Sequence, residues 1–360
     1  MQPLVATPPA LAALSTRLAA HARIGLDTEF LRERTYRAQL CLLQVASADE
    51  ALCIDPLALA DLAPLAPLLT GSSVLKVMHA SRQDLEVLLP VAGLARPVFD
   101  TQIAASLTGL PAQVGYAEAV RRFLGRELDK AHTRTDWSRR PLTPQQVEYA
   151  LDDVRYLLPL AARLEEELGR LGRRGWLEEE LAALSDPRTL TVAPEDAWQR
   201  VKGLRALDPA RERLLRTLAA WRERAALEHN RPRGWILDDT VLRELVLQVP
   251  RTLAALTATP EMPPGLVKRR GAELLECIES AGVPSPPPLL PGRQRPDPQR
   301  AALVKQLSGI SQAAARELNL VPEVLATRRD LEQLAEGRRD GAVLHGWRRK
   351  VLGERLLAAL

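Results

Sequence analysis

Apolar and polar positions follow two different patterns along this chain, and the first is the pattern of short strands. In the first part, apolar runs of strand length are separated by polar turns, with helix-like segments between some of them. The expected strands cover residues 23–30, 38–47, 51–57 and 73–79. Because the first three follow one another closely, they predict an antiparallel meander.

Helix-like segments complete this part of the chain. We expect helices over 58–69 and 81–89, the second with Ser81 as its N-cap, and a short strand that turns into a helix near Asp100. Strands mixed with helices predict an α/β domain, here a mixed sheet flanked by helices over residues 1–200.

One helix start carries strong local signals. Thr143 is an N-cap candidate, Pro144 takes the first helical position, and Gln146 completes a capping box. Apolar residues then recur at helical spacing, so we expect one long helix from about 144 to 168.

The second half of the chain has only helical patterns. Residues 207–283 read as one compact helical domain, and 299–360 as a second copy of a similar unit. Between them, residues 284–298 contain seven prolines in fifteen positions, which predicts a semi-rigid, extended linker.

Composition and charge narrow the class of protein. The 360 residues are 46% hydrophobic, enough for packed cores, and no uncharged apolar run is long enough to span a membrane. The N-terminus lacks the pattern of a secretory signal. Three separated cysteines, Cys41, Cys53 and Cys277, indicate free thiols in a reducing cytoplasm. A net charge of +4 weakly favours a polyanionic partner such as nucleic acid.

Two acidic residues interrupt the first expected strand. Strand alternation places Asp27 and Glu29 on one face and Leu26 and Thr28 on the other. Two carboxylates about 7 Å apart on one face repel each other, and a bound divalent cation would remove that repulsion. The alternative is an ordinary solvated strand face.

Further acids lie where the fold could bring them to the same place. Asp84 falls in the first turn of the helix expected over 81–89, and Asp153 lies on the expected long helix. Tyr149 precedes Asp153 by one helical turn, so both project from one face. Taken singly, Asp84 is explained by the helix dipole and Asp153 by surface exposure. Only the combination indicates a site.

Three short motifs in order resemble those of a known nuclease family. "DTEF", "HASRQDLE" and "YALDDVRYL" resemble the three motifs of the DEDD exonuclease superfamily, and the tyrosine before the last acid is typical of its DEDDy branch. "LDKAHTRTDWSRRPLT" is similar to the segment before the third motif in the ribonuclease D family. The helical half resembles two HRDC domains, the second of them divergent.

This resemblance implies a ribonuclease H-like fold with a two-metal 3′–5′ exonuclease site using Mg²⁺ or Mn²⁺. It implies that Asp27 bridges two ions, that Glu29 and Asp153 favour the ion that activates water, and that Asp84 acts on the other. The tyrosine–acid spacing selects Asp153 rather than its neighbour Asp152. A phenol with a pKa of about 10 is a poor base, so Tyr149 is expected to position the attacking water.

Several basic residues outside the acidic set are candidates for RNA contacts. Lys130, Arg139 and Arg140 are candidates for phosphate contacts, with simple surface solubility as the alternative. Basic segments 264–271 and 346–350 are candidate patches on the helical half. Three tryptophans are expected to pack in cores rather than to stack on bases: Trp137, Trp221 and Trp235. His79 is expected to be a buried, hydrogen-bonded histidine.

The resemblance implies a cytoplasmic, monomeric 3′–5′ exoribonuclease without a membrane partner. Its expected substrate is RNA with a single-stranded 3′ tail, with tRNA precursors as the family substrate. Two alternatives stay open at this point: a DNA exonuclease of the same fold, and a catalytically inactive RNA-binding scaffold.

Overall fold

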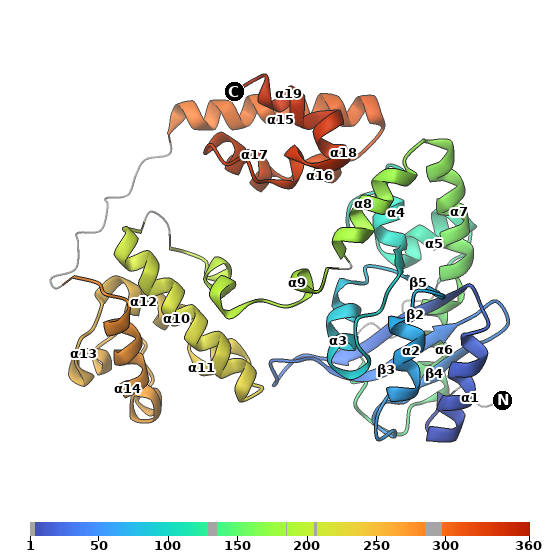
Figure 1. Ribbon diagram of the computed structural model, residues 1–360, viewed down its shortest axis with the longest axis horizontal. Coiled ribbons are helices and arrows are strands. Elements are labelled where there is room, and N and C mark those ends of the chain that lie inside the picture. Colours follow the sequence, from blue (N-terminus) through green and yellow to red (C-terminus); the bar gives the residue numbers. More distant parts are fainter. Residues whose placement is uncertain (1–3, 129–134, 185, 205–206, 285–296) are drawn as a thin grey trace. The chain divides into compact units, whose positions relative to one another are not determined.

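The computed structural model describes residues 4–128, 135–184, 186–204, 207–284 and 297–360 (Figure 1). The chain forms two compact units. The first consists of Met1–Leu31, Leu40–Leu190 and Pro296–Leu360, and the second of Arg32–Gln39 and Thr191–Arg295. None of the helices in the described ranges combines the length and the apolar content needed to cross a membrane.

A six-stranded mixed sheet organises the first unit. Its strands run in the order β1-β4-β3-β2-β5-β6. β3 and β4 pair antiparallel, whereas β1 pairs parallel with β4, and β5 pairs parallel with both β2 and β6. The predicted strands are confirmed as Arg23–Leu31 (β2), Gln39–Ala46 (β3), Ala51–Ile54 (β4), Leu75–Met78 (β5) and Val98–Asp100 (β6). The two-residue strand Leu4–Val5 (β1) was not predicted.

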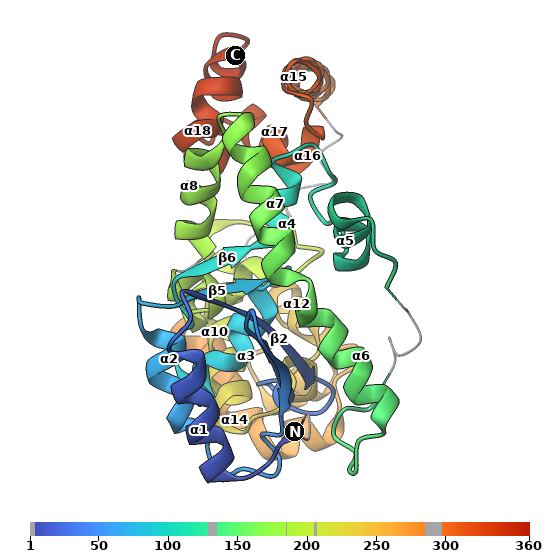
Figure 2. The same cartoon turned by 90° about the vertical axis from the view of Figure 1, so that its right-hand side faces the viewer.

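Helices cover both faces of this sheet. Figure 2 shows α1, α2 and α3 on one side of β2 and α6 on the other. The helix predicted over 58–69 is instead the 3₁₀ turn η1 followed by the short α2, because Pro64 and Pro67 each occupy the start of a helical segment. The helices of this part are Pro8–Leu18 (α1), Ala63–Leu65 (η1), Ala66–Thr70 (α2), Arg82–Ala92 (α3), Thr101–Ser106 (α4), Tyr116–Leu124 (α5), Arg174–Leu184 (α8) and Pro187–Leu190 (α9).

The long helix predicted over 144–168 is two helices, α6 (Pro144–Arg155) and α7 (Leu157–Arg170). The capping box of Thr143 and Gln146 at its start is confirmed. The break follows from Pro159, which has no N–H for the carbonyl of Arg155 and would clash with it in a continuous helix. Tyr156 leaves the helical conformation at the junction, with φ −104° and ψ 1°.

The C-terminal helices share one hydrophobic core with the sheet-bearing part of the first unit. Trp347 stacks on Trp176 of α8, with ring centroids 4.3 Å apart, and its Nε1 donates to Glu180 at 2.8 Å. Arg348 also pairs with Glu180. Trp347 and Arg348 of the predicted basic patch 346–350 are therefore engaged in packing. The helices are Pro298–Leu318 (α15), Pro322–Leu325 (α16), Arg328–Ala335 (α17), Ala342–Leu344 (η3), Gly346–Arg348 (α18), Arg349–Gly353 (η4) and Glu354–Leu357 (α19).

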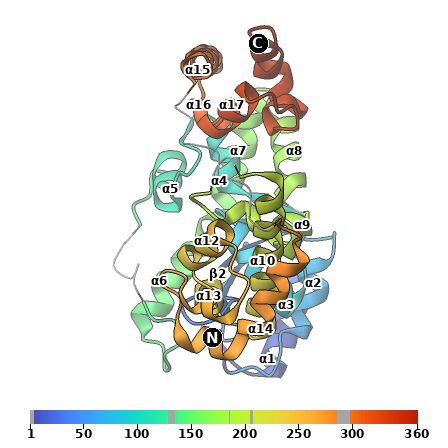
Figure 3. The same ribbon diagram turned by 90° about the vertical axis from the view of Figure 1, so that its left-hand side faces the viewer.

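The second unit is helical, as predicted, and Figure 3 shows α10, α12, α13 and α14 grouped together. Asp208 caps α10 through the N–H groups of Ala210 and Arg211. Tyr36, from the segment Arg32–Gln39, donates its hydroxyl proton to buried Glu223. The elements are Pro194–Arg200 (η2), Pro209–Glu228 (α10), Arg233–Ile236 (α11), Asp239–Gln248 (α12), Leu253–Thr257 (α13) and Pro264–Ser280 (α14).

Candidate active site

Strand β2 carries the first two acids of the candidate site. Asp27 and Glu29 alternate with buried Leu26 and Thr28, as the strand pattern predicts. Burial, together with the nearby acids Asp84, Asp153 and Glu29, holds the pKa of Asp27 well above its usual range. Burial, Asp153 and Asp84 raise the pKa of Glu29 to about 8. Both shifts mean that ionising these carboxyls together is unfavourable.

Asp84 approaches the same place from the first turn of α3. It is almost fully buried and accepts a hydrogen bond from the Thr28 hydroxyl. Burial raises the pKa of Asp84 to about 7 although this hydrogen bond opposes the shift. Sequence reasoning missed Thr28, whose position on the opposite face from Asp27 suggested only a core residue.

The loop before α3 is fixed by a second buried acid. Asp100 accepts hydrogen bonds from the N–H and the hydroxyl of Ser81, both at 2.8 Å, and from the N–H of Ala80 at 3.2 Å. The same carboxylate caps α4 through Gln102 and Ile103. The side chain of Ser81 therefore bonds Asp100 and does not cap α3, contrary to prediction. Asp100 belongs to the support of the site and not to its acidic cluster.

Helix α6 contributes Asp153 and Tyr149 from one face. Burial is the main cause that raises the pKa of Asp153 to about 7, and the charge of Asp152 adds to it. Asp152 itself forms an ion pair with Arg155 at 2.7 Å, so its carboxylate has a cationic partner on the same helix. Burial raises the pKa of Tyr149 to about 12, and Asp153, Glu29 and Asp27 all push in the same direction.

Trp137 supports the ring of Tyr149. The two rings stack at a centroid distance of 6.3 Å and an interplanar angle of 26°, and Trp137 is only 4% exposed. The expectation that Trp137 packs rather than stacks on a base is thus confirmed. Its position limits how far the Tyr149 ring can turn.

The junction between α6 and α7 lies directly against β2. A Cβ at Gly25 would come within 3.2 Å of the Val154 carbonyl oxygen and 3.4 Å of Leu157 Cβ, so glycine permits this approach two residues before Asp27. The hydroxyl of Tyr116 lies at this junction, between two backbone groups that would bond each other in a continuous helix. It accepts a hydrogen bond from the N–H of Tyr156 at 3.2 Å and donates to the Asp152 carbonyl at 3.3 Å.

The phenol ring of Tyr116 is held in turn by His79. The rings meet edge to face at 5.5 Å. Both nitrogens of His79 are engaged, Nδ1 with Thr101 Oγ1 at 2.8 Å and Nε2 with the Val114 carbonyl at 2.9 Å. The prediction of a hydrogen-bonded histidine is confirmed, although His79 is half-buried and not fully buried as predicted. Tyr116 carried no sequence signal, because its partners are backbone groups 36 and 40 residues away.

The structure thus gathers all five predicted site residues into one electrostatically coupled cluster: Asp27, Glu29, Asp84, Tyr149 and Asp153. No three His, Cys, Asp or Glu side chains among the described residues converge closely enough to share one ion as they stand. Like charges in a desolvated site oppose closer approach, and a divalent cation would reverse that balance. Carboxylate oxygens are the donors that Mg²⁺ and Mn²⁺ prefer, so the set fits such ions.

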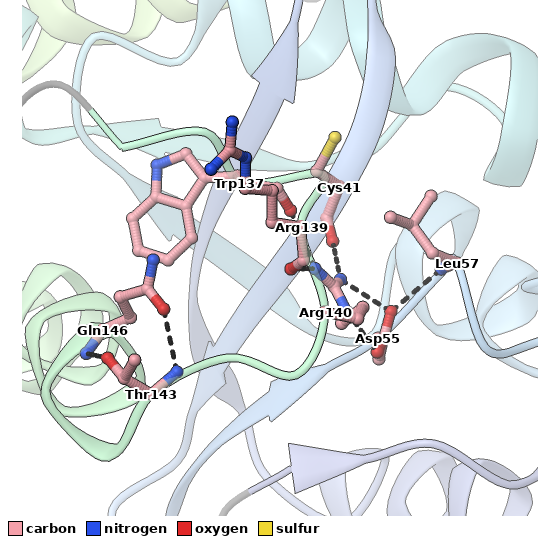
Figure 4. A network of polar contacts seen from close by, with 8 residues as sticks. All are labelled: Cys41, Asp55, Leu57, Trp137, Arg139, Arg140, Thr143 and Gln146. Atoms are coloured by element: carbon pink, nitrogen blue, oxygen red, sulfur yellow. Dashed lines mark hydrogen bonds and ion pairs between the residues drawn. The ribbon is translucent and has the colours of Figure 1, made fainter.

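The predicted RNA contacts fare differently (Figure 4). All five N–H donors of Arg140 are used: it forms a two-pronged ion pair with buried Asp55 and bonds the carbonyls of Cys41, Trp137 and Arg139. Arg140 is therefore a structural residue, which corrects the prediction of a phosphate contact. The Arg139 side chain is 84% exposed, and its role stays a prediction. Lys130 lies outside the described residues.

Comparisons with known proteins agree with this arrangement. A model of 3′–5′ exonucleases matches residues 4–169, and a model of the HRDC domain matches residues 211–278. Ribonuclease D of Nitrobacter hamburgensis is 38% identical over 361 residues, which cover 99% of this chain and 94% of the relative. Ribonuclease D of a Jannaschia species is 41% identical over 366 residues, with the same two coverages.

A solved structure extends the agreement to the whole fold. The crystal structure of Escherichia coli RNase D, described as an exoribonuclease involved in structured RNA processing, has a TM-score of 0.87 and 33% identity. The match covers 99% of this chain and 98% of that one. Exonucleases of this fold generally depend on divalent metal ions. The chain belongs to the ribonuclease D family of 3′–5′ exoribonucleases.

Proposed function

We propose that this exoribonuclease trims the 3′ ends of structured RNAs, tRNA precursors among them, with two Mg²⁺ or Mn²⁺ ions at the acidic cluster. The observation that carries this proposal is that acids from three separate elements, β2, α3 and α6, meet in one buried place. Burial raises the pKa of Glu29, Asp84 and Asp153, and the charges of Asp153 and Asp84 raise that of Glu29 further. Buried acids so close together are a costly arrangement unless cations compensate them.

The chain's own residues divide the work in this mechanism. Asp27, Glu29, Asp84 and Asp153 would hold the ions, which supply charge stabilisation for the attacking and leaving oxygens when bound. Because the pKa of Tyr149 is raised to about 12, its hydroxyl keeps its proton and acts by hydrogen bonding. It would orient the attacking water toward the terminal phosphodiester, with Trp137 holding the ring.

Two further properties are part of the proposal. The three free cysteines, two of them buried, fit a reducing cytoplasm. We also propose that the protein acts as a monomer, which light scattering at working concentration tests. A second HRDC-like domain in residues 299–360 and the boundaries 207–283 for the first stay predictions.

The direct experiment compares substrates and metals. A 3′-extended tRNA precursor and a DNA of matched length and sequence are each incubated with the protein, with Mg²⁺ or with EDTA, beside Asp27→Asn. We expect shortening of the RNA from its 3′ end with release of nucleoside 5′-monophosphates, dependent on metal and absent in Asp27→Asn. Equal cleavage of DNA would favour a DNA exonuclease, and binding without cleavage would favour an RNA-binding scaffold.

A further inference from the structure

A shallow hollow of about 770 Å³ lies on the second unit between α11 and the start of α14. Trp235 of α11 lines it together with four basic residues, two from α14 and two from the segment that leads into α11: Arg269, Arg270, His229 and Arg231. We call this surface the Trp235 hollow. It is separate in sequence from every residue of the acidic cluster.

Trp235 is exposed to an unusual degree for a tryptophan. Its side chain is 58% exposed, which contradicts the expectation that it packs in a core. The reason is local: the next residues, Ile236 and Leu237, occupy the core positions and are 7% and 1% exposed. The indole therefore contributes little to packing of this unit. The exposed indole presents a flat aromatic face on which a base can stack.

The charges around the ring are mainly positive. The guanidinium of Arg231 lies over the indole, 5.8 Å from its centroid, and Arg269 is exposed on the opposite wall. Glu273 is the acid among the lining residues, and it is already engaged by Arg270 at 2.9 Å and by the Trp221 indole N–H at 3.0 Å. The surface thus combines an accessible aromatic face with cations that are suited to phosphate.

We infer that the Trp235 hollow binds an unpaired nucleotide of the RNA, whose base stacks on Trp235 and whose phosphates contact Arg231 and Arg269. Base stacking on an aromatic ring beside phosphate-binding arginines is a general mode of single-strand recognition and does not depend on base sequence. This inference rests on the proposed function, because it adds a second contact point for the same RNA. An acidic peptide would use the cations but would have little use for the flat ring.

The test is a binding titration with the full chain carrying Asp27→Asn, so that the RNA is not cleaved. A fluorescein-labelled single-stranded RNA is titrated by anisotropy at several salt concentrations without added divalent metal. Trp235→Ala should weaken binding by about tenfold with the salt slope unchanged, and Trp235→Phe should retain most of the affinity. Arg269→Ala should instead reduce the salt slope by about 0.7, because one phosphate contact is lost.

Leu253→Ala is the matched control, since Leu253 is a 53% exposed apolar side chain of the same unit. Equal affinities of Trp235→Ala and Leu253→Ala would overturn the inference, as would a titration in which Trp235→Ala changes the salt slope alone. Loss of affinity in Trp235→Ala beside a wild-type enzyme that leaves tRNA precursors intact would refute the proposed substrate only. Normal trimming of tRNA precursors by wild type, with unchanged RNA affinity in Trp235→Ala, would refute only the RNA-binding role of the Trp235 hollow. This outcome includes the case in which an acidic protein segment occupies the hollow.

Discussion

Tyr116→Phe tests whether the gap between α6 and α7 sets the position of Asp153. The substitution keeps the ring against His79 and removes only the hydroxyl that joins the Tyr156 N–H to the Asp152 carbonyl. With the hydroxyl gone, these two backbone groups can be satisfied by closing toward each other or by admitting water. Either change reorients the last turn of α6, which carries Asp153.

The magnitude follows from the geometry. The two hydrogen bonds, 3.2 and 3.3 Å long, are at the weak end for their types, so each should contribute roughly 0.5–1 kcal/mol. The total, about 1–2 kcal/mol, corresponds to roughly 5–30-fold. We expect kcat to fall within that range while KM for RNA changes little, because the contact supports a metal-binding acid and not the RNA.

The assay combines kinetics with a readout that needs no turnover. Initial rates on a labelled RNA are measured across Mn²⁺ concentrations. The Mn²⁺ concentration that gives the half-maximal rate, the Mn²⁺ midpoint, should be higher in Tyr116→Phe than in wild type. Hydrogen exchange of the Tyr156 amide is measured in the metal-free protein and should be faster or slower than in wild type. Tyr36→Phe is the control, because Tyr36 is another hydrogen-bonded tyrosine, located in the second unit.

One pattern would refute the reasoning. If Tyr116→Phe lowered the melting temperature but left kcat, the Mn²⁺ midpoint and the Tyr156 exchange rate at wild-type values, Tyr116 would be a stability residue only. Loss of activity in both Tyr116→Phe and Tyr36→Phe with unchanged metal midpoints would lead to the same conclusion.

Three more predictions concern the site and its support. Tyr149→Phe should lower kcat by about 10–100-fold with unchanged Mn²⁺ affinity by calorimetry, and an unaltered kcat would exclude a water-positioning role. Arg140→Ala should lower the free energy of unfolding by about 3–5 kcal/mol in urea, because it leaves Asp55 buried without its partner. The RNA affinity of the folded protein should not change. A loss of RNA affinity with normal stability would support the original prediction that Arg140 contacts phosphate. Because burial and neighbouring acids raise the pKa of Glu29 from 4.5 to about 8, the folded state binds more protons than the unfolded state across that interval, so the metal-free protein should lose stability as pH rises through it. Thermal unfolding from pH 4.5 to 8 checks this, Mg²⁺ should flatten the decline, and a stability that rises with pH would contradict it.

Much of the fold could be predicted because its signals are local. Apolar runs bounded by turns predict the longer strands of the sheet, and a capping box that spans four residues predicts the start of α6. The grouping of five site residues was accessible because three motifs with fixed internal spacing resemble a known family. Alternation on β2 and helical spacing on α6 then assigned the faces on which these residues lie.

The remaining features depend on contacts that no local pattern specifies. The break between α6 and α7 had a sequence signal in Pro159, but the continuous apolar periodicity on either side obscured it. Arg140 looked like a surface cation because Asp55, its partner, lies 85 residues earlier in the chain. The exposure of Trp235 depends on which of three consecutive apolar residues enter the core, and hydrophobicity alone would have buried all three.

The packing of the C-terminal helices is also a long-range effect. Their pattern indicated a separate unit, yet Trp347 stacks on Trp176 of α8, which lies 171 residues earlier in the chain. A tryptophan at an apolar position indicates burial but not which surface provides it.

The central claim is that Asp27, Glu29, Asp84 and Asp153 bind divalent cations together, and crystals soaked in Mn²⁺ test it most directly. Diffraction data collected at the manganese absorption edge should contain strong anomalous peaks between β2, α3 and α6, with carboxylate oxygens of these acids as ligands. Anomalous maps without density at this position, or with manganese bound only by other residues, would contradict the account.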